Sequence, residues 1–195
     1  MEENMTKIAV VIGSTRQGRQ SDRLANWVAN NIKGKADVEV LDLRDFPIPF
    51  LDEAISPRYN PERKADEPTQ KWLDAIAPFD GYVLVTPEYN RSTSGVLKNA
   101  LDVLDYQIDN KPVALVAHGT SGGGQAVANL RMALPGVGGV AIPQALFFSD
   151  RLADSISESG ELKQEIADRP YGPQPNLEAQ VDSLLKYAEA LKSVR

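Results

Sequence analysis

Residues 81–102 read GYVLVTPEYNRSTSGVLKNALD, and in them a strand pattern, a polar loop and a helix pattern follow one another. Tyr82 to Val85 are aromatic, β-branched or aliphatic, which is typical of a central strand. Pro87 ends this run, because proline has no N–H for the hydrogen-bond ladder. Residues 88–95 then supply a carboxylate, a phenol, an amide, a guanidinium and three hydroxyls. A simple turn needs fewer polar groups, so we predict that this loop binds a ligand.

The same alternation of strand and helix extends along the chain. Apolar strand patterns are predicted over residues 7–12, 38–43, 81–86, 112–118 and 140–148. Helical spacing is predicted over residues 22–32, 69–77, 96–104, 125–134 and 177–191, with a short helix around 162–166. Five apolar strands that alternate with helices predict an α/β fold, in which a parallel sheet is covered by helices on both faces. No linker or internal repeat divides the sequence, and we expect residues 1–195 to form one domain.

Two long segments interrupt the alternation. Residues 44–68 carry five prolines and little periodicity, and residues 149–176 are rich in charge and proline. Both are too long for plain connectors. We expect such segments to form a pocket wall, an interface or a mobile cover.

The composition excludes several classes of function. The chain has no cysteine and a single histidine, His118, so we expect no metal site and no thiol- or histidine-based triad. The net charge of -6 argues against nucleic acid as a partner. The charged amino terminus leads directly into a strand, and no apolar run approaches the ~18 residues that span a bilayer. We therefore expect a cytoplasmic protein without a signal peptide or a membrane segment.

A second polar loop, GSTRQGRQS at residues 13–21, follows the first strand. In a five-stranded parallel sheet of order 2-1-3-4-5, ligands bind where the strand order reverses, between strands 1 and 3. Glycines let this loop approach a ligand, Ser14 and Ser21 offer hydroxyls, and the unpaired N–H groups of the next helix point back into it. We predict that the loop binds a phosphate group, with Arg16 or Arg19 adding a charge-assisted hydrogen bond.

Residues 13–21 also allow a purely structural interpretation. Ser21 or Asp22 could simply cap the helix, with the arginines paired to surface acids. The glycine spacing matches the start of a P-loop, but Arg19 and Gln20 occupy the lysine and hydroxyl positions, which argues against ATP. The middle glycine of a dinucleotide-binding G-x-G-x-x-G turn is also missing. A single phosphate ester therefore fits better than a tightly bound dinucleotide.

The loop after residue 87 suits a planar ring. Tyr89 offers a flat face, and Asn90 and Ser92 can hydrogen-bond to the edge of a heterocycle. Glu88 is either a ligand contact or a structural carboxylate bonded to backbone N–H groups or an arginine. Ser94 is expected to cap the helix that follows.

A third loop, HGTSGGGQ at residues 118–125, follows the fourth strand. Its consecutive glycines leave room for a ring against the backbone, and their N–H groups could bond to a ring carbonyl. The alternative is an ordinary glycine-rich turn before a helix. We expect His118 to be structural, and Trp27 and Trp72 to pack in the core.

With these three loops, the chain resembles the NADPH-dependent FMN reductase family of the flavodoxin-like superfamily, which includes quinone, azo-dye and chromate reductases. The resemblance rests on GSTR at residues 13–16 with Ser21, on PEYN at residues 87–90 with Ser92 and residues 95–102, and on the glycine-rich run 119–124. It runs from residue 8 to about residue 134. Ser94 departs from the pattern, because many members have proline there, and either residue can begin a helix.

The resemblance implies a flavodoxin-like three-layer fold with FMN as the cofactor. It implies that the first loop holds the FMN phosphate, that the PEYN loop lines the isoalloxazine ring, and that the third loop covers the pyrimidine side of that ring. The residues assigned to the cofactor are Ser14, Arg16, Arg19, Ser21, Pro87, Glu88, Tyr89, Asn90, Ser92, Gly119, Ser121, Gly122 and Gly123.

The implied activity is hydride transfer from NADPH or NADH to bound FMN, and on to a small-molecule acceptor such as a quinone, a free flavin, an azo compound or a metal oxyanion. The flavin carries the hydride, so no catalytic side chain is expected. Backbone N–H groups near Gly122 and Gly123 would stabilise charge on the reduced ring. Family members are commonly homodimers or homotetramers, and the resemblance extends that expectation here. The alternatives are a flavodoxin-type electron carrier without NAD(P)H oxidase activity and a non-catalytic binding domain.

Overall fold

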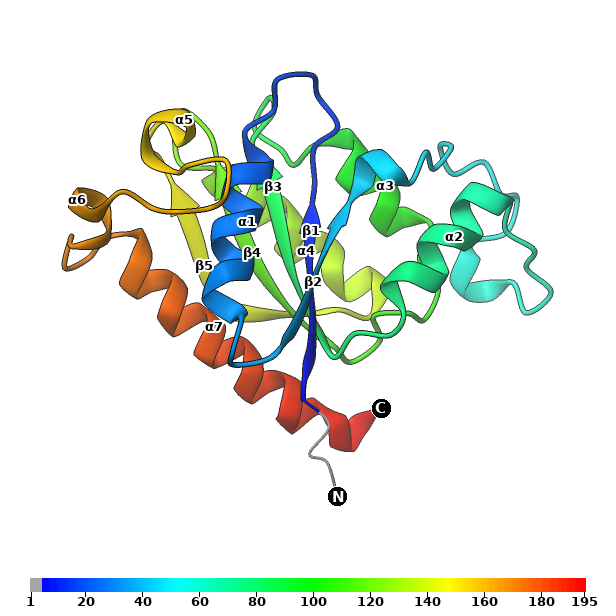
Figure 1. Cartoon of the computed structure of the whole chain (residues 1–195). Helices are drawn as coiled ribbons and strands as arrows, with labels where there is room; N and C mark the ends of the chain where they lie inside the picture. Colours follow the sequence, from blue (N-terminus) through cyan, green and yellow to red (C-terminus); the bar gives the residue numbers. More distant parts are fainter. Residues whose placement is uncertain (1–4) are drawn as a thin grey trace.

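A computed structural model describes residues 5–195, and it contains one five-stranded parallel sheet with helices on both faces (Figure 1). The strands are β1 (Lys7–Ile12), β2 (Asp37–Asp42), β3 (Gly81–Pro87), β4 (Pro112–His118) and β5 (Val140–Phe148). Their order is β2-β1-β3-β4-β5. The predicted flavodoxin-like α/β fold is therefore confirmed. Residues 1–4, part of the charged amino terminus in which we expect no signal peptide, lie outside the described residues.

The helices divide between the two faces of the sheet. The longer helices are α1 (Ser21–Ile32), α2 (Glu67–Ile76), α3 (Gly95–Asp102), α4 (Gly124–Ala133) and α7 (Pro173–Ala190), and the short ones are α5 (Leu152–Ser155) and α6 (Gln164–Ala167). Single 3-10 turns lie at Leu43–Asp45, Pro57–Tyr59, Leu134–Val137 and Leu191–Val194. Helices α1 and α7 pack on one face, and α2, α3 and α4 pack on the other (Figure 1). Within residues 5–195, none of the helices has the length and apolar character needed to cross a bilayer.

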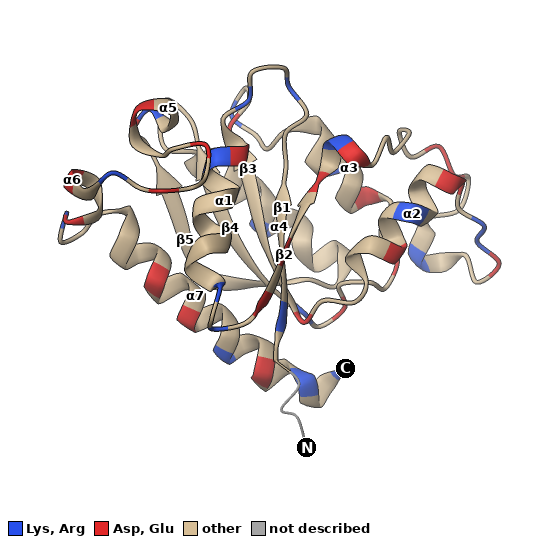
Figure 2. Ribbon diagram, in the orientation of Figure 1, with Lys and Arg blue, Asp and Glu red and all other residues tan. Residues whose placement is uncertain are grey.

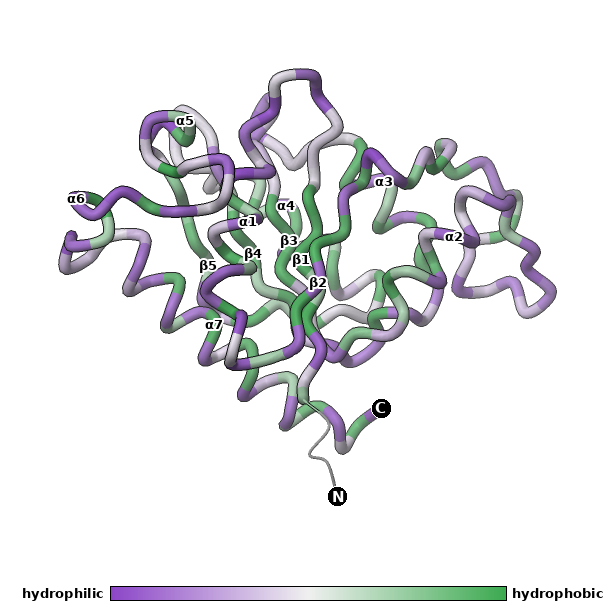
Figure 3. Tube along the Cα trace, viewed as in Figure 1, coloured by the Kyte–Doolittle hydropathy of each residue, from purple (hydrophilic) through white to green (hydrophobic). Residues whose placement is uncertain are grey.

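Alternation along the strands builds the two cores. In β1, Ile8 and Val10 face α1 and α7, whereas Ala9 and Val11 face the opposite layer. All of these side chains are fully buried, because helices cover both faces of a parallel sheet. Figure 3 shows the result as apolar strands in the centre and polar segments around them. Trp27 and Trp72 belong to these cores, as predicted.

The helix boundaries differ from the predicted ones where proline begins a helix. Helix α7 starts at Pro173, four residues before the predicted start, and α2 starts at Glu67 with proline in its first turn. Proline suits these positions, because its fixed φ matches the helix and its missing N–H is not needed there. Asp66 completes the start of α2, since its side chain accepts a hydrogen bond from the Thr69 N–H at 2.8 Å.

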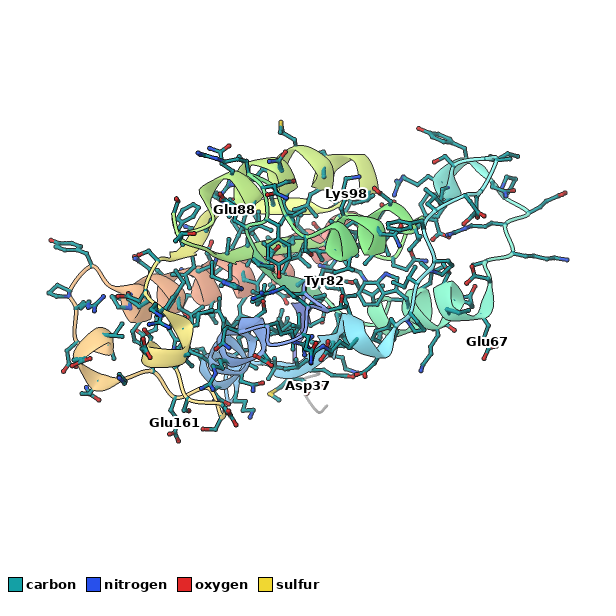
Figure 4. The ribbon with its side chains drawn as sticks, turned by 90° about the horizontal axis from the view of Figure 1, so that it is seen from above. Asp37, Glu67, Tyr82, Glu88, Lys98 and Glu161 are labelled. Carbon is teal, nitrogen blue, oxygen red and sulfur yellow. The ribbon has the colours of Figure 1, made fainter. Side chains whose placement is uncertain are left out.

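Side chains attach the proline-rich segment 44–68 to the rest of the fold. Asn99 of α3 donates to the Pro49 carbonyl at 2.9 Å and accepts from the Leu51 N–H at 3.2 Å. Arg63 is buried between the carboxylates of Glu53 and Asp105. The segment therefore forms a fixed flank of the molecule. Figure 4 shows Glu67 near this flank and Glu161 at the opposite end of the molecule, with Tyr82 between them.

An irregularity in the edge strand β5 is filled by a buried glutamine. The pairing of β5 with β4 shifts register between Val113 and Leu115, where β5 carries Pro143. Gln180 of α7 is buried against this point, and its amide donates to the carbonyls of Leu115 at 2.9 Å and Gln144 at 3.2 Å. The side chain thus satisfies carbonyl groups that the interrupted ladder leaves without strand partners.

Candidate functional site

The three polar loops meet at the carboxyl ends of β1, β3 and β4. Ile12 pairs with Val85, and Pro87 pairs with His118, so the three central strands end at nearly the same level. The loop 13–20 rises above this edge (Figure 1). The sequence therefore brings its three predicted ligand loops together at the point where the strand order reverses.

The β1 loop is held by contacts with the β3 loop. The Ser94 hydroxyl donates to the Gly13 carbonyl, and the hydroxyls of Ser14 and Tyr89 lie 3.1 Å apart. Gly13 is required here, because a Cβ would lie 2.8 Å from the Val85 carbonyl oxygen. The Ser94 side chain also accepts from the Leu97 N–H at 3.2 Å, so the predicted cap of α3 is confirmed.

The two arginines of the β1 loop have different environments. Arg16 is exposed, and Figure 2 shows basic residues along this loop. Arg19 is only 7% exposed, and its guanidinium donates to both carboxylate oxygens of Asp42 and to the Ser14 carbonyl. The hydrogen bond to Asp42 raises the pKa of Arg19. Burial alone would raise the pKa of Asp42, but the hydrogen bonds from Arg19 and the Arg44 N–H outweigh it and lower that pKa. Arg19 therefore connects the loop to β2, and its predicted contact with a phosphate stays a prediction.

Helix α1 begins without a side-chain cap. Its N-cap residue, Gln20, makes no capping hydrogen bond, and Ser21 contributes its hydroxyl to His118 Nε2 at 2.8 Å. Ser21 is fully buried. Ser21 therefore does not cap the helix, whereas Asp22, the other residue considered as a cap, accepts a hydrogen bond from the Arg23 N–H at 2.9 Å.

The PEYN loop is a tight turn. The Tyr89 N–H donates to the Ser92 carbonyl at 2.9 Å, and the Ser92 N–H donates to the Tyr89 carbonyl at 3.0 Å. The two central residues, Asn90 and Arg91, have φ values of 50° and 67°. This is the geometry of a type I′ turn, in which asparagine is favoured because it tolerates a positive φ. The geometry of the turn therefore explains in part why asparagine occupies position 90.

Glu88 and the third loop hold one another in place. The Glu88 carboxylate accepts from the Gln125 N–H in the first turn of α4 at 2.9 Å, which is the structural interpretation of this residue. The Gly122 N–H donates to the Gly119 carbonyl at 2.9 Å. The Gly122 N–H is thus engaged within the turn, and the role of backbone N–H groups near Gly122 and Gly123 toward a ring stays a prediction.

A cavity of about 390 Å³ opens beside these loops. Of the predicted site residues it is lined by Arg16, Arg19, Ser21, Pro87, Tyr89 and Gly119. The other predicted residues do not line it, namely Ser14, Glu88, Asn90, Ser92, Ser121, Gly122 and Gly123. The cavity wall therefore combines two arginines at the start of α1 with the aromatic ring of Tyr89 and the open position at Gly119.

Several lining residues were not predicted from the sequence. They are Gln20, His118, Thr120 and residues 149–153. Residues 149–153 follow β5, and they show that the segment 149–176 contributes a pocket wall, one of its expected roles. Their position after a fifth strand is the signal that could have identified them, because all five strands end at the same edge. His118 had the same signal as the last residue of β4.

The comparisons with known proteins agree with this geometry. Residues 6–153 match the sequence model described as NADPH-dependent FMN reductase. The NAD(P)H-dependent FMN reductase ntnL of Nectria sp is 38% identical over 136 residues, which are 67% of this chain and 68% of that protein. A NADPH azoreductase of a Bacillus species is 34% identical over 160 residues, covering 80% of this chain and 83% of that protein.

Solved structures show the same fold. The flavoenzyme FerB of Paracoccus denitrificans, an NAD(P)H:(acceptor) oxidoreductase, superposes with a TM-score of 0.74 at 24% identity, covering 95% of this chain and 98% of that one. At this identity the likeness concerns the fold alone. The family match covers most of the chain, and its start and end enclose all three loops. The chain is a member of the NADPH-dependent FMN reductase family.

Proposed function

We propose that the protein is an FMN-dependent NAD(P)H oxidoreductase that passes hydride from NADPH or NADH to bound FMN and on to a small-molecule acceptor. Acceptor classes that suit the proposal are quinones, free flavins, azo compounds and metal oxyanions. The observation that carries it is the 390 Å³ cavity, whose wall combines the arginines and the start of α1 with an aromatic side chain and a glycine. FMN has parts that match this wall, a phosphate group and a planar ring.

The residues present fit this cofactor. For the phosphate, Arg16 and Ser21 both line the cavity, Arg16 from an exposed position, and the N-cap residue of α1, Gln20, makes no side-chain capping bond. For the ring, Tyr89 and Gly119 line the cavity, and Gly119 has no side chain to narrow it. When bound, FMN supplies the hydride acceptor and donor. The protein binds and orients the cofactor, and we propose that Arg16, Ser21 and the α1 N–H groups bind its phosphate.

Ser14 and Arg19 are proposed as supports of the phosphate loop. The Arg19 guanidinium joins the Ser14 carbonyl to Asp42 of β2, and the Ser14 hydroxyl lies 3.1 Å from that of Tyr89. Glu88 and Gly122 are proposed as supports of the ring-side loops. Glu88 accepts a hydrogen bond from the Gln125 N–H of α4, and the Gly122 N–H donates to the Gly119 carbonyl. Asn90, Ser92, Ser121 and Gly123 stay in the proposal as residues of the ring-side loops.

The experiment is the reduction of the purified protein loaded with FMN. Under anaerobic conditions, NADPH or NADH should bleach the flavin absorbance within the time of mixing, and a quinone should restore it. Stable absorbance with either nucleotide would instead indicate a flavodoxin-type carrier. A protein that takes up no FMN during reconstitution would contradict the whole proposal and favour a non-catalytic binding domain.

The proposal extends to a cytoplasmic homodimer or homotetramer. Large apolar side chains are exposed in the segment 44–68 and on Tyr106, which contacts it: Phe50 is 82% exposed, Tyr59 is 80% exposed and Tyr106 is 60% exposed. Tyr106 donates to the Arg58 carbonyl at 2.6 Å, which places it beside Tyr59. Light scattering should report more than one chain per particle, and Phe50→Ser with Tyr59→Ser should lower that mass. Tyr171→Ser, which alters an exposed tyrosine elsewhere, is the control.

A further inference from the structure

The single histidine of the chain forms a hydrogen-bonded pair with the first residue of α1. His118 Nε2 lies 2.8 Å from Ser21 Oγ, and both residues line the 390 Å³ cavity. His118 ends β4 and Ser21 begins α1, so the pair joins the strand and the helix beside the cavity. Each side chain therefore fixes the orientation of the other beside the proposed phosphate position.

The direction of this hydrogen bond decides what Ser21 can offer a ligand. A hydroxyl has one hydrogen. If Ser21 gives it to Nε2, the Ser21 oxygen presents only lone pairs to the cavity, and these repel the oxygens of a phosphate. If instead Nε2–H donates to Ser21, the Ser21 hydrogen is available to a phosphate dianion, whose oxygens can only accept. Phosphate binding therefore selects the second arrangement.

We propose that His118 is a positioning residue for the phosphate group of FMN: its Nε2–H donates to Ser21 Oγ and so holds the Ser21 hydroxyl as a hydrogen-bond donor to the phosphate. The inference rests on the proposed function, because it takes FMN as the ligand of the cavity. It concerns only the phosphate, which separates His118 from residues that contact the ring.

The surroundings of His118 keep its imidazole neutral. Burial, followed by the positive charge of Arg16, lowers the pKa of His118 to about 4. The nearby acids have other partners: Glu88 accepts from the Gln125 N–H, Asp150 pairs with Arg169, and Asp22 lies 3.6 Å from Arg19. A neutral imidazole carries one N–H, so two tautomers are available at pH 7, and the proposal is that the bound phosphate, acting through Ser21, selects the one protonated on Nε2.

Ser21 is available for this role because its hydroxyl does not cap its own helix. The N-cap position belongs to Gln20, which makes no side-chain capping bond. Ser21 is fully buried, so water does not compete for its hydroxyl at the His118 side. The hydroxyl thus has one fixed protein partner, and the proposal places the phosphate on its other side, where Ser21 borders the cavity.

The first test compares FMN with riboflavin, which lacks the phosphate. Affinities for both flavins are measured by fluorescence quenching in the wild type, His118→Leu and His118→Gln. Leucine removes the donor, whereas glutamine places an N–H near the position of Nε2. We expect FMN to bind about tenfold more weakly to His118→Leu and nearly normally to His118→Gln. Riboflavin affinity should be the same in all three proteins.

A double variant tests whether His118 acts through Ser21. If it does, His118→Leu should weaken FMN binding in the wild-type background and have no further effect in the Ser21→Ala background. Additive losses would overturn the inference, as would an unchanged FMN affinity of His118→Leu or an equal loss for FMN and riboflavin.

The tautomer can be observed directly even if a variant fails to fold. Because His118 is the only histidine, a long-range ¹H–¹⁵N spectrum of the histidine-labelled, untagged protein with FMN reports this ring alone. A proton on Nε2 supports the inference, and a ring protonated on Nδ1 but not on Nε2 overturns it. If the wild type binds neither flavin, the proposed function itself fails. If the wild type prefers FMN to riboflavin and His118→Leu does too, only the role of His118 fails.

Discussion

Arg16 and Arg19 lie in one loop, yet the structure gives them different partners. Arg16 is exposed and lines the cavity, whereas Arg19 is buried against Asp42. We expect Arg16→Ala to weaken FMN binding roughly ten- to a hundredfold, because a charge-assisted hydrogen bond is worth about 1.5–3 kcal/mol. Riboflavin affinity and the melting temperature should not change. Titration of both flavins checks this, and an unchanged FMN affinity would remove Arg16 from the site.

Arg19→Ala should behave differently and serves as the matched comparison. It leaves the partly buried Asp42 carboxylate without its partner, so we expect a loss of about 3 kcal/mol in the free energy of unfolding. For a chain of this size that is a melting temperature lower by about 6–12 °C. Thermal unfolding of Arg16→Ala and Arg19→Ala under the same conditions checks this. A lower melting temperature for Arg19→Ala alone indicates that Arg19 supports the loop, whereas Arg16 contacts the ligand.

Neighbouring glycines at the start of α4 allow a second test at the same scale. Gly123 has a φ of 88°, and a Cβ there would lie 2.5 Å from the Ala117 Cβ, whereas a Cβ on Gly124 meets nothing within 4 Å. Gly123→Ala should therefore destabilise the fold by about 3 kcal/mol or more. Gly124→Ala should be neutral or stabilising by up to about 1 kcal/mol. Urea unfolding checks both, and equal effects would contradict the strain argument.

At the scale of elements, the strands were predictable and the helix starts were less so. The strands 7–12, 112–118 and 140–148 have the predicted boundaries, because continuous apolar runs between polar loops leave few alternatives. Helix α7 starts earlier than its apolar spacing suggested, because Pro173 begins it before the first buried residue, Leu177. The irregularity of β5 was not predicted at all. Gln180 fills this irregularity through a contact between segments that are far apart in the sequence, which no local pattern indicates.

The contact of α7 with the irregular strand gives the prediction at this scale. Gln180→Leu keeps the volume but removes the donor for the buried Leu115 carbonyl and the part-buried Gln144 carbonyl. We expect a loss of about 2 kcal/mol in the free energy of unfolding, because unsatisfied buried acceptors are costly. Lys186→Ala, at an exposed position of the same helix, should have almost no effect. Similar stabilities of the two variants in urea would show that the carbonyls find other partners.

For the whole molecule, acid stability should depend on the link between β2 and the phosphate loop. The pKa of Asp42 is lowered in the fold, so its contribution is present above the unfolded value of about 3.9 and is lost as the pH falls through the folded value. Asp42→Asn removes this titration. Its free energy of unfolding should therefore fall less steeply than that of the wild type between about pH 5 and pH 3. Urea unfolding at several pH values checks this, and parallel curves would contradict it.

The site as a whole could be located from the sequence, but its internal contacts could not. Strand order and loop chemistry placed residues 13–21 and 87–95 at one edge, because parallel strands all end there. The partners Asp42 for Arg19 and His118 for Ser21 come from β2 and β4, and no local spacing indicates them. Buried polar side chains choose partners through the packed fold, which is why loops were predicted and their hydrogen bonds were not.

The proline and register shift of β5 have one more consequence, which concerns concentrated solution. Strands β2 and β5 are the two edges of the sheet, and an open edge can pair with a strand of another molecule and seed aggregation. On β5, Pro143 offers no N–H to such a strand. On β2, Asp37 and Glu39 are exposed and would bring like charges together. Both edges of the sheet therefore carry a feature that disfavours pairing with a strand of another molecule.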